Sequence, residues 1–284
     1  MLLKNAINNI PSLQAGNTAS ITMPIGQRLH ELSLFLSSSG VRTPITSTNV
    51  TRIRVTIGAY TLIDWDVNSF LLYAQRIGRS VAVGEIPIFF TDPTSRALPN
   101  AYAGSIDTKQ GITSVTVYVT HGTITAPTMT GILTFDNFPN EKTVWVAGKK
   151  TQVAFNTPIL KTTQNENIPT SANATITDIA ADYPLSCLTL TNGADANISY
   201  LRLSLDSQLV YEGAPADIAR MILTRGIYTP PGTVVLPFTE DGFMPGSAPS
   251  FSQLTLTMNS SATFASNVII EKQLPSLPRN AAGS

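Results

Sequence analysis

The residues most able to do chemistry are two groups of carboxylates. Asp64 and Asp66 flank Trp65, while Glu240 and Asp241 are adjacent and follow an alternating apolar segment. Opposed carboxylates are the catalytic groups of glycosidases, and converging carboxylate oxygens can bind calcium. In a simpler interpretation, Asp64 or Asp66 is a helix N-cap and the other two form a solvated turn. These four residues are the candidates for a structural calcium site, and no catalytic or cofactor-binding residue is predicted.

The histidines and the cysteine do not form a recognisable catalytic or metal motif. His30 and His121 are far apart in the chain, and zinc sites usually take histidines at short, characteristic spacings. Cys187 lies in an apolar alternation that is typical of a buried small side chain. We therefore predict that the protein is not an enzyme. A jelly-roll lyase or hydrolase stays open as an alternative that would need carboxylates or histidines to converge in one pocket.

The two tryptophans suggest a second alternative. Trp65 and Trp145 lie in strand-rich sequence, where an exposed indole can form a platform for a sugar ring. Tryptophans in such surroundings are more often part of the core or of an interface. A carbohydrate-binding or adhesion β-sandwich is therefore kept as the alternative function.

The overall composition excludes several classes of protein. The 284 residues include 18 Lys and Arg against 18 Asp and Glu, and one Cys. A net charge of zero argues against direct nucleic-acid binding, and one Cys excludes a disulfide scaffold. Two long charge-free stretches, 111–135 and 242–270, are broken by Pro and interleaved with Thr and Ser. We expect neither a signal peptide nor a transmembrane segment.

Hydrophobic periodicity predicts an all-β fold. Apolar residues alternate with polar ones in segments that we expect to be half-buried antiparallel strands. The clearest examples are 53–57, 115–119, 201–205 and 254–258. Two segments with helical spacing interrupt the strands, at 66–77 and 215–225, and each ends at a glycine.

The two halves of the chain match each other without a gap over residues 50–92 when the sequence is shifted by 148 positions. Ile53 then coincides with Leu201, and Gly78 with Gly226. A strand, a helix, a glycine and a strand in the same order indicate a duplicated domain. We predict two tandem jelly-roll β-sandwiches, each with one short helix inserted. The expected boundaries are an N-terminal arm 1–16, a first jelly roll 17–155, a linker 156–171, a second jelly roll 172–274 and a tail 275–284.

The N-terminal region resembles a known family. Residues 10–27 carry Ile-Pro, then Ala-Gly-Asn, then Ser-Ile, then Pro-Ile-Gly-Gln, a pattern similar to the start of corticovirus-type major capsid proteins. Residues 52–55 and, more loosely, 176–205 also resemble that family. The family belongs to the double jelly-roll lineage that also includes the tectivirus and adenovirus coat proteins.

The resemblance implies a structural coat subunit that forms pseudo-hexameric trimers and tiles an icosahedral shell around an internal membrane. The implied partners are the chain itself as a homotrimer, neighbouring capsomers, and penton and membrane-associated virion proteins. The implied location is the virion, with assembly in the cytoplasm of the host of a bacteriophage. Neutral, weakly charged surfaces suit such a function because they associate at a small desolvation cost.

Overall fold

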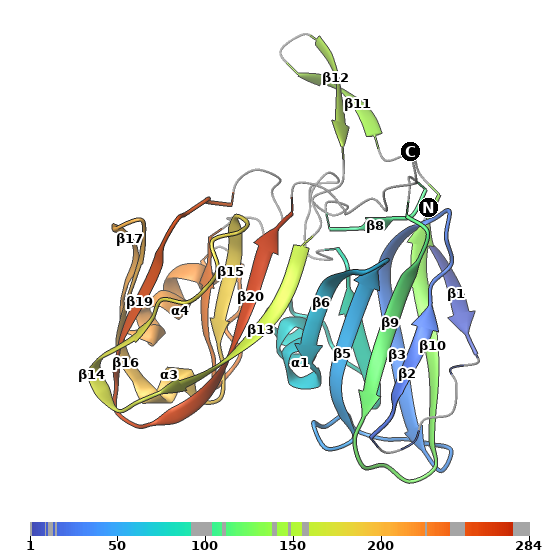
Figure 1. Ribbon diagram of the computed structural model, residues 1–284, viewed down its shortest axis with the longest axis horizontal. Helices are drawn as coiled ribbons and strands as arrows, with labels where there is room; N and C mark the ends of the chain where they lie inside the picture. The colour runs from blue at the N-terminus through green and yellow to red at the C-terminus, as the bar shows by residue number, and fades with distance from the viewer. Residues whose placement is uncertain are drawn as a thin grey trace. The chain divides into compact units, whose positions relative to one another are not determined.

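The computed structural model shows a protein built from β-sheets that divides into two units (Figure 1). It describes residues 2–8, 10, 14, 16–91, 104–109, 112–137, 141–146, 149–154, 159–224, 226–238 and 248–274. Within this part of the chain, the first unit comprises residues up to 74 and 80–159, and the second comprises 75–79 and 160–274. No helix in the described ranges is long and apolar enough to cross a membrane.

The first unit contains two antiparallel sheets and one helix. One sheet has the order β7-β3-β10-β1, with the short strands β4 and β8 also paired to β3. Its strands are β1 (Leu3–Ile7), β3 (Arg28–Ser38), β4 (Val41–Arg42), β7 (Glu85–Phe89), β8 (Ile106–Asp107) and β10 (Pro127–Asp136). The other sheet has the order β6-β5-β9-β2. Its strands are β2 (Thr18–Thr22), β5 (Val50–Ile57), β6 (Tyr60–Asp66) and β9 (Val115–His121). Helix α1 (Val67–Arg76) follows β6, and β11 (Glu141–Val146) forms a hairpin with β12 (Lys149–Ala154).

The second unit repeats this plan. One sheet has the order β18-β15-β20-β13 and the other has the order β17-β16-β19-β14. The strands of the first of these are β13 (Ile159–Ile168), β15 (Leu185–Leu190), β18 (Val234–Pro237) and β20 (Phe264–Gln273). Those of the second are β14 (Ser171–Ile176), β16 (Ile198–Leu205), β17 (Gln208–Gly213) and β19 (Leu254–Ser260). Helices α3 (Ala194–Asn197) and α4 (Pro215–Leu223) complete the unit.

The predicted duplication is therefore confirmed strand by strand. Strand β5 and strand β16 start 148 positions apart, as do β6 and β17, and α1 and α4. The bulges also repeat, because pairing between β5 and β6 shifts after Val55, and pairing between β16 and β17 shifts after Leu203. Two such sandwiches in one chain make a double jelly roll, as the sequence predicts.

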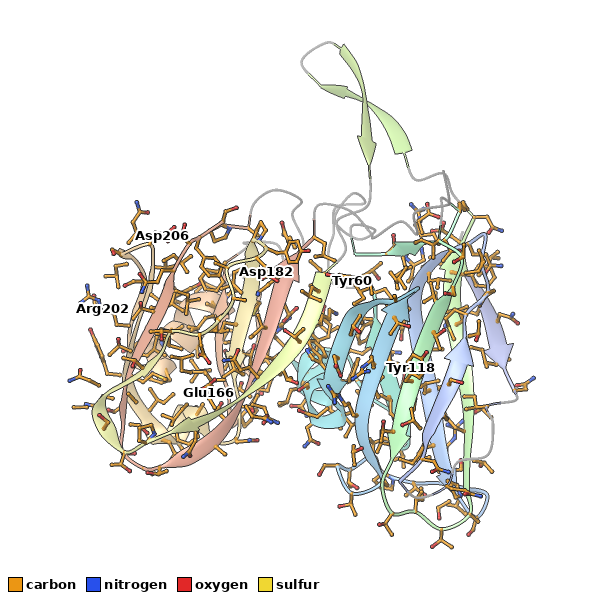
Figure 2. All side chains as sticks on the ribbon, viewed as in Figure 1. Tyr60, Tyr118, Glu166, Asp182, Arg202 and Asp206 are labelled. Atoms are coloured by element: carbon orange, nitrogen blue, oxygen red, sulfur yellow. The ribbon has the colours of Figure 1, made fainter. Side chains whose placement is uncertain are left out.

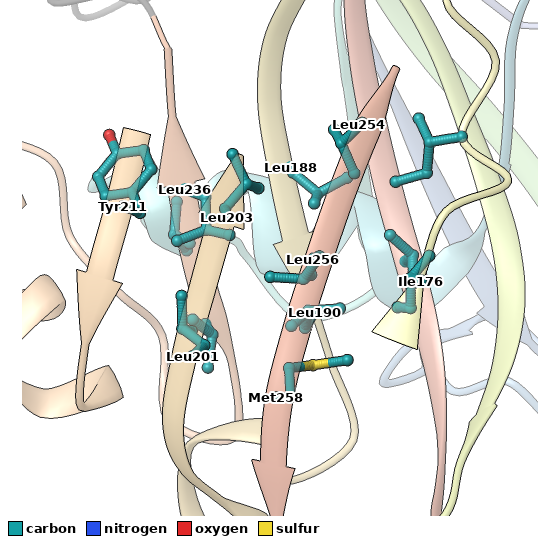
Figure 3. Packing of buried hydrophobic residues seen from close by; sticks show 14 of the residues in the cluster. Ile176, Leu188, Leu190, Leu201, Leu203, Tyr211, Leu236, Leu254, Leu256 and Met258 are labelled. Carbon is teal, nitrogen blue, oxygen red and sulfur yellow. The ribbon is translucent and has the colours of Figure 1, made fainter. Parts of the chain in front are cut away.

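Alternating side chains build a separate core in each unit. In the first unit Ile53, Val55 and Ile57 are buried on one face of β5, as the period-two pattern predicts. The core of the second unit collects its apolar side chains from both of its sheets and from α4, and Figure 3 shows part of this packing. The opposite face of β16 points to solvent, as Arg202 does in Figure 2.

The helices agree with the prediction apart from one addition. Helices α1 and α4 lie within the two segments predicted to be helical. The expectation of one helix per unit is wrong for the second unit, because α3 forms a further short helix there. Helix α3 begins after Gly193, whose φ of 82° places it in the left-handed region that favours glycine. Four residues give too little periodicity to be recognised from sequence.

Segments expected to lie outside the jelly rolls contribute strands to them. The expected arm 1–16 contains β1, which pairs along β10 from Leu3↔Phe135 to Ile7↔Gly131. The expected linker 156–171 contains the whole of β13, and the units divide after Ile159. The polar composition of β13 hid its strand character, because only its two ends and Lys161 are buried. The expected tail 275–284 lies outside the described residues.

Candidate functional site

Asp64 is held by arginines on the outer face of the first unit. It lies on β6 opposite Arg54 of β5. Arg52, which is also on β5, approaches Asp64 as well. The Arg52 Nε and Nη2 atoms donate to the two Asp64 oxygens at 2.5 and 2.6 Å, and Arg54 Nε lies 3.3 Å from Oδ2. Hydrogen bonding to Asp64 raises the pKa of Arg52. Both carboxylate oxygens are therefore occupied by guanidinium groups rather than directed at an empty position.

Asp66 caps helix α1. Its Oδ1 accepts a hydrogen bond from the Ser69 backbone N–H at 2.9 Å, and Oδ2 accepts one from the Ser69 hydroxyl at 3.1 Å. This is the N-cap interaction, in which a side-chain oxygen satisfies a free N–H of the first turn. The simpler interpretation of Asp66 thus agrees with the structure. Within the described ranges, no three His, Cys, Asp or Glu side chains come close enough to hold a metal ion.

Of the remaining candidates, only Trp65 lies in the part of the chain whose side chains are described. Glu240 and Asp241 lie outside the described residues, as does the side chain of Trp145. Trp65 is 1% exposed and packs against Phe70 and Tyr73, so the indole cannot serve as a surface platform for a sugar. The sugar-platform interpretation of Trp65 is wrong because helix α1 covers the indole.

Cys187 is buried and unreactive. It lies on β15, and burial raises the pKa of its thiol to about 11, so the thiolate is not formed near neutral pH. His121 is also buried, and desolvation lowers the pKa of its imidazole. The two residues belong to the cores of different units.

A buried charged cluster in the first unit was not predicted from the sequence. Arg28 and His30 are neighbours on the buried face of β3, and Asp136 ends β10. The Arg28 Nε and Nη2 atoms donate to both oxygens of Asp136 at 3.0–3.3 Å, and His30 Nε2 lies 2.6 Å from Oδ2. Arg28, His30 and Asp136 are 2%, 4% and 0% exposed.

The cluster ties together three strands at one end of the sheet. Asp107 of β8 is buried opposite Arg28, and its Oδ1 accepts the Lys109 N–H at 2.9 Å. Burial raises the pKa of Asp107, and burial lowers the pKa of His30 although Asp136 partly offsets this. Burying charges is tolerated only when they are paired and hydrogen-bonded, so the bidentate Arg28–Asp136 pair holds these strand ends in place. The sequence signal that could have indicated this cluster is the presence of Arg28 and His30, two positions apart, in a largely apolar strand.

Several large apolar side chains are exposed, and some of them gather on two parts of the sheets. In the second unit, six large apolar side chains are 41–58% exposed, all on β16, β17, α4 or the segment after α4. They are Tyr200, Leu209, Val210, Met221, Leu223 and Tyr228. In the first unit, Leu2, Leu3 and Ile132 are exposed on or beside β1 and β10. Such groups of exposed apolar residues mark association surfaces.

The fold and these surfaces can be compared with known proteins. Residues 4–135 match the family model described as viral coat protein P2 N-terminal domain. This segment is therefore similar to a viral coat protein P2 N-terminal domain. The matched range begins at β1 and ends one residue before the end of β10, so it covers most of the first unit. A comparison with curated proteins finds no match.

Solved capsid proteins share the fold of the whole chain. The chain is similar to the major capsid protein P2 from bacteriophage PM2, with 17% identity, a TM-score of 0.79 and 99% of each chain covered. It is also similar to a chain of the Sulfolobus Turreted Icosahedral Virus structure, with 12% identity, a TM-score of 0.64 and coverage of 100% and 94%. A chain of the PBCV-1 virus capsid matches with 13% identity, a TM-score of 0.56 and coverage of 96% and 94%. The likeness to these solved structures shows that the chain has the double jelly-roll fold.

Proposed function

We propose that this chain is a major capsid subunit that assembles as a homotrimer and tiles an icosahedral shell around an internal membrane. The observation that carries the proposal is the duplication of one sandwich topology within the chain. Three copies contribute six similar sandwiches, so a threefold ring of chains approximates a hexagonal tile. The trimer would then contact neighbouring capsomers, penton proteins and membrane-associated virion proteins.

The side-chain chemistry supports a mechanical role and no catalytic one. The candidate carboxylates Asp64 and Asp66 hold arginines and a helix terminus, and the Cys187 thiol is protonated near neutral pH. Equal numbers of acidic and basic residues allow many copies to pack with little mutual repulsion. The internal membrane would separate this neutral shell from the genome, so no nucleic-acid contact is required. Assembly would take place in the host cytoplasm.

Sedimentation of the purified chain at micromolar concentration tests the trimer. We expect a single species with three times the 30.4 kDa mass of the chain. A stable monomer or dimer under these conditions would contradict the proposal. Lipid analysis of purified particles tests the internal membrane, because the proposal requires phospholipid inside the shell.

A further inference from the structure

Two edge strands of at least five residues, β1 and β17, expose aliphatic side chains. Strand β1 is the last strand of its sheet and is exposed along almost its whole length, and the same is true of β17 in the second unit. Leu3 on β1 is 37% exposed, while Leu209 and Val210 on β17 are 47% and 42% exposed. The edge strands β2 and β14 follow the usual pattern, with their exposed positions mostly Thr, Ser and Asn. An exposed aliphatic edge strand readily pairs with another chain.

The duplication allows each of these two edge strands to be compared with its counterpart in the other unit. By sheet order, β1 corresponds to β13 and β17 corresponds to β6. Val210 aligns with Leu62 of β6, which is only 2% exposed, and the ends of β13, Ile159 and Ile168, are each 2% exposed. The exposed position on β17 thus has a buried counterpart in the first unit, and the strand that corresponds to β1 is buried at both ends. The chain keeps apolar residues at both open edges, where water would favour polar ones.

We propose that the β17 edge of one copy, together with the apolar surface of α4 beside it, docks against the β1 edge of a second copy. This inference rests on the proposed trimer and specifies its contact. Because the two surfaces differ, the contact is heterologous, and three such contacts related by a threefold axis close a ring. Each copy then uses its β1 edge once and its β17 edge once.

The charges on the two edges favour this pairing over its symmetric alternatives. Lys4 is the charged residue of β1, and Glu212 is the charged residue of β17. Docking of β1 against β17 brings opposite charges to one interface. A symmetric contact between two β1 strands, or between two β17 strands, would instead bring two like charges into one interface. Like charges opposite each other destabilise strand pairing.

Cross-linking with a short bismaleimide tests the contact. We expect the double variant Leu3→Cys/Val210→Cys to give covalent trimers on a denaturing gel, because every interface then carries both thiols. Each single variant should stay monomeric on the gel, and an equimolar mixture of the two single variants should give covalent dimers. The wild type serves as control, because the thiol of Cys187 is buried and protonated.

The possible results separate this inference from the trimer on which it rests. Covalent dimers from either single variant would show a symmetric contact and overturn the proposal. A double variant that sediments as a trimer but gives no cross-linked chains would also overturn it, while leaving the trimer intact. A wild-type chain that does not sediment as a trimer would instead contradict the proposed function.

Dissociation of the trimer provides a second measurement. We expect Leu3→Asp and Val210→Asp each to weaken trimer formation by about tenfold or more, because a carboxylate would be desolvated against apolar side chains. Val41→Asp is the matched control, since Val41 is 69% exposed on β4, away from both proposed edges. Equal weakening by all three substitutions, or none by the first two, would contradict the assignment.

Discussion

The two jelly rolls share their strand order and bulges but differ in how polar groups hold one end of the sandwich. In the first unit the Arg28–Asp136 ion pair is wholly buried, and buried His30 also contacts Asp136. In the second unit Lys272 of β20 binds Asp182 at 2.5 Å, and the Asp182 side chain is 48% exposed. The neighbouring Glu271 forms a more buried pair with Arg76 at 2.5 Å. The two units have thus kept the same strand order and bulges, which the burial of their apolar faces requires. Ionic anchors have diverged, because the fold does not depend on a particular pair.

The largest expected effect is the loss of either core. Ile53→Asp and Leu201→Asp change corresponding positions that are both fully buried. Each introduces an unpaired charge into a core, at a cost of several kcal/mol, so we expect each to abolish soluble expression. Thr51→Asp, at an exposed position of β5, is the control and should remain soluble. Soluble, folded Leu201→Asp alone would show that the two cores are not equivalent.

The ionic anchors should differ in strength. Asp136→Asn leaves Arg28 buried without its anionic partner, and we expect the free energy of unfolding to fall by about 3–5 kcal/mol. Asp182→Asn in the second unit removes the anionic partner of Lys272, but Asp182 is 48% exposed and Lys272 keeps its hydrogen bond to the Ala180 carbonyl, so we expect a smaller loss than for Asp136→Asn. Urea unfolding monitored by circular dichroism measures both. Similar losses for the two variants would contradict the contrast between the units.

Acid should destabilise the first unit selectively, because both histidines of the chain lie there. Burial lowers the pKa of His30 and of His121, so the unfolded chain binds more protons than the folded one below pH 6.5. Stability is therefore lost as the pH falls from 6.5 towards the folded pKa values, by up to about 1.4 kcal/mol per pH unit for each histidine. The raised pKa of Asp107 acts in the opposite direction.

Melting temperatures between pH 7.5 and 5 test this selectivity. The variant His30→Gln/His121→Gln should show a flatter pH dependence than the wild type. An unchanged slope would mean that these histidines do not govern the loss of stability in acid.

The smallest effects concern the helix caps. Asp66 caps α1, whereas the corresponding Ala214 offers no side-chain cap to α4. Asp66→Ala should lower the free energy of unfolding by about 1 kcal/mol, and Ala214→Asp should raise it by up to about 1 kcal/mol. Thermal unfolding of the two variants measures both changes. A destabilised Ala214→Asp would show that the start of α4 cannot adopt the geometry that α1 uses.

Several elements were predictable because their signal is local. The strands around Ile53 and Leu201 alternate with period two, and both main helices show apolar residues at helical spacing before a glycine. Strand β13 escaped prediction because most of its side chains are polar. The Arg28–Asp136 pair escaped because its partners are 108 positions apart and meet only when β3 pairs with β10.

The sequence by itself determined the all-β class, the duplication at an offset of 148 residues and the strand faces that are buried. These properties follow from periodicity, which every strand carries in its own residues. Only the tertiary structure decided that Asp64 pairs with arginines, that Trp65 is covered by α1, and that β1 and β17 are open apolar edges. Exposure and pairing are properties of neighbours brought together by folding, and local sequence does not record which neighbours those are.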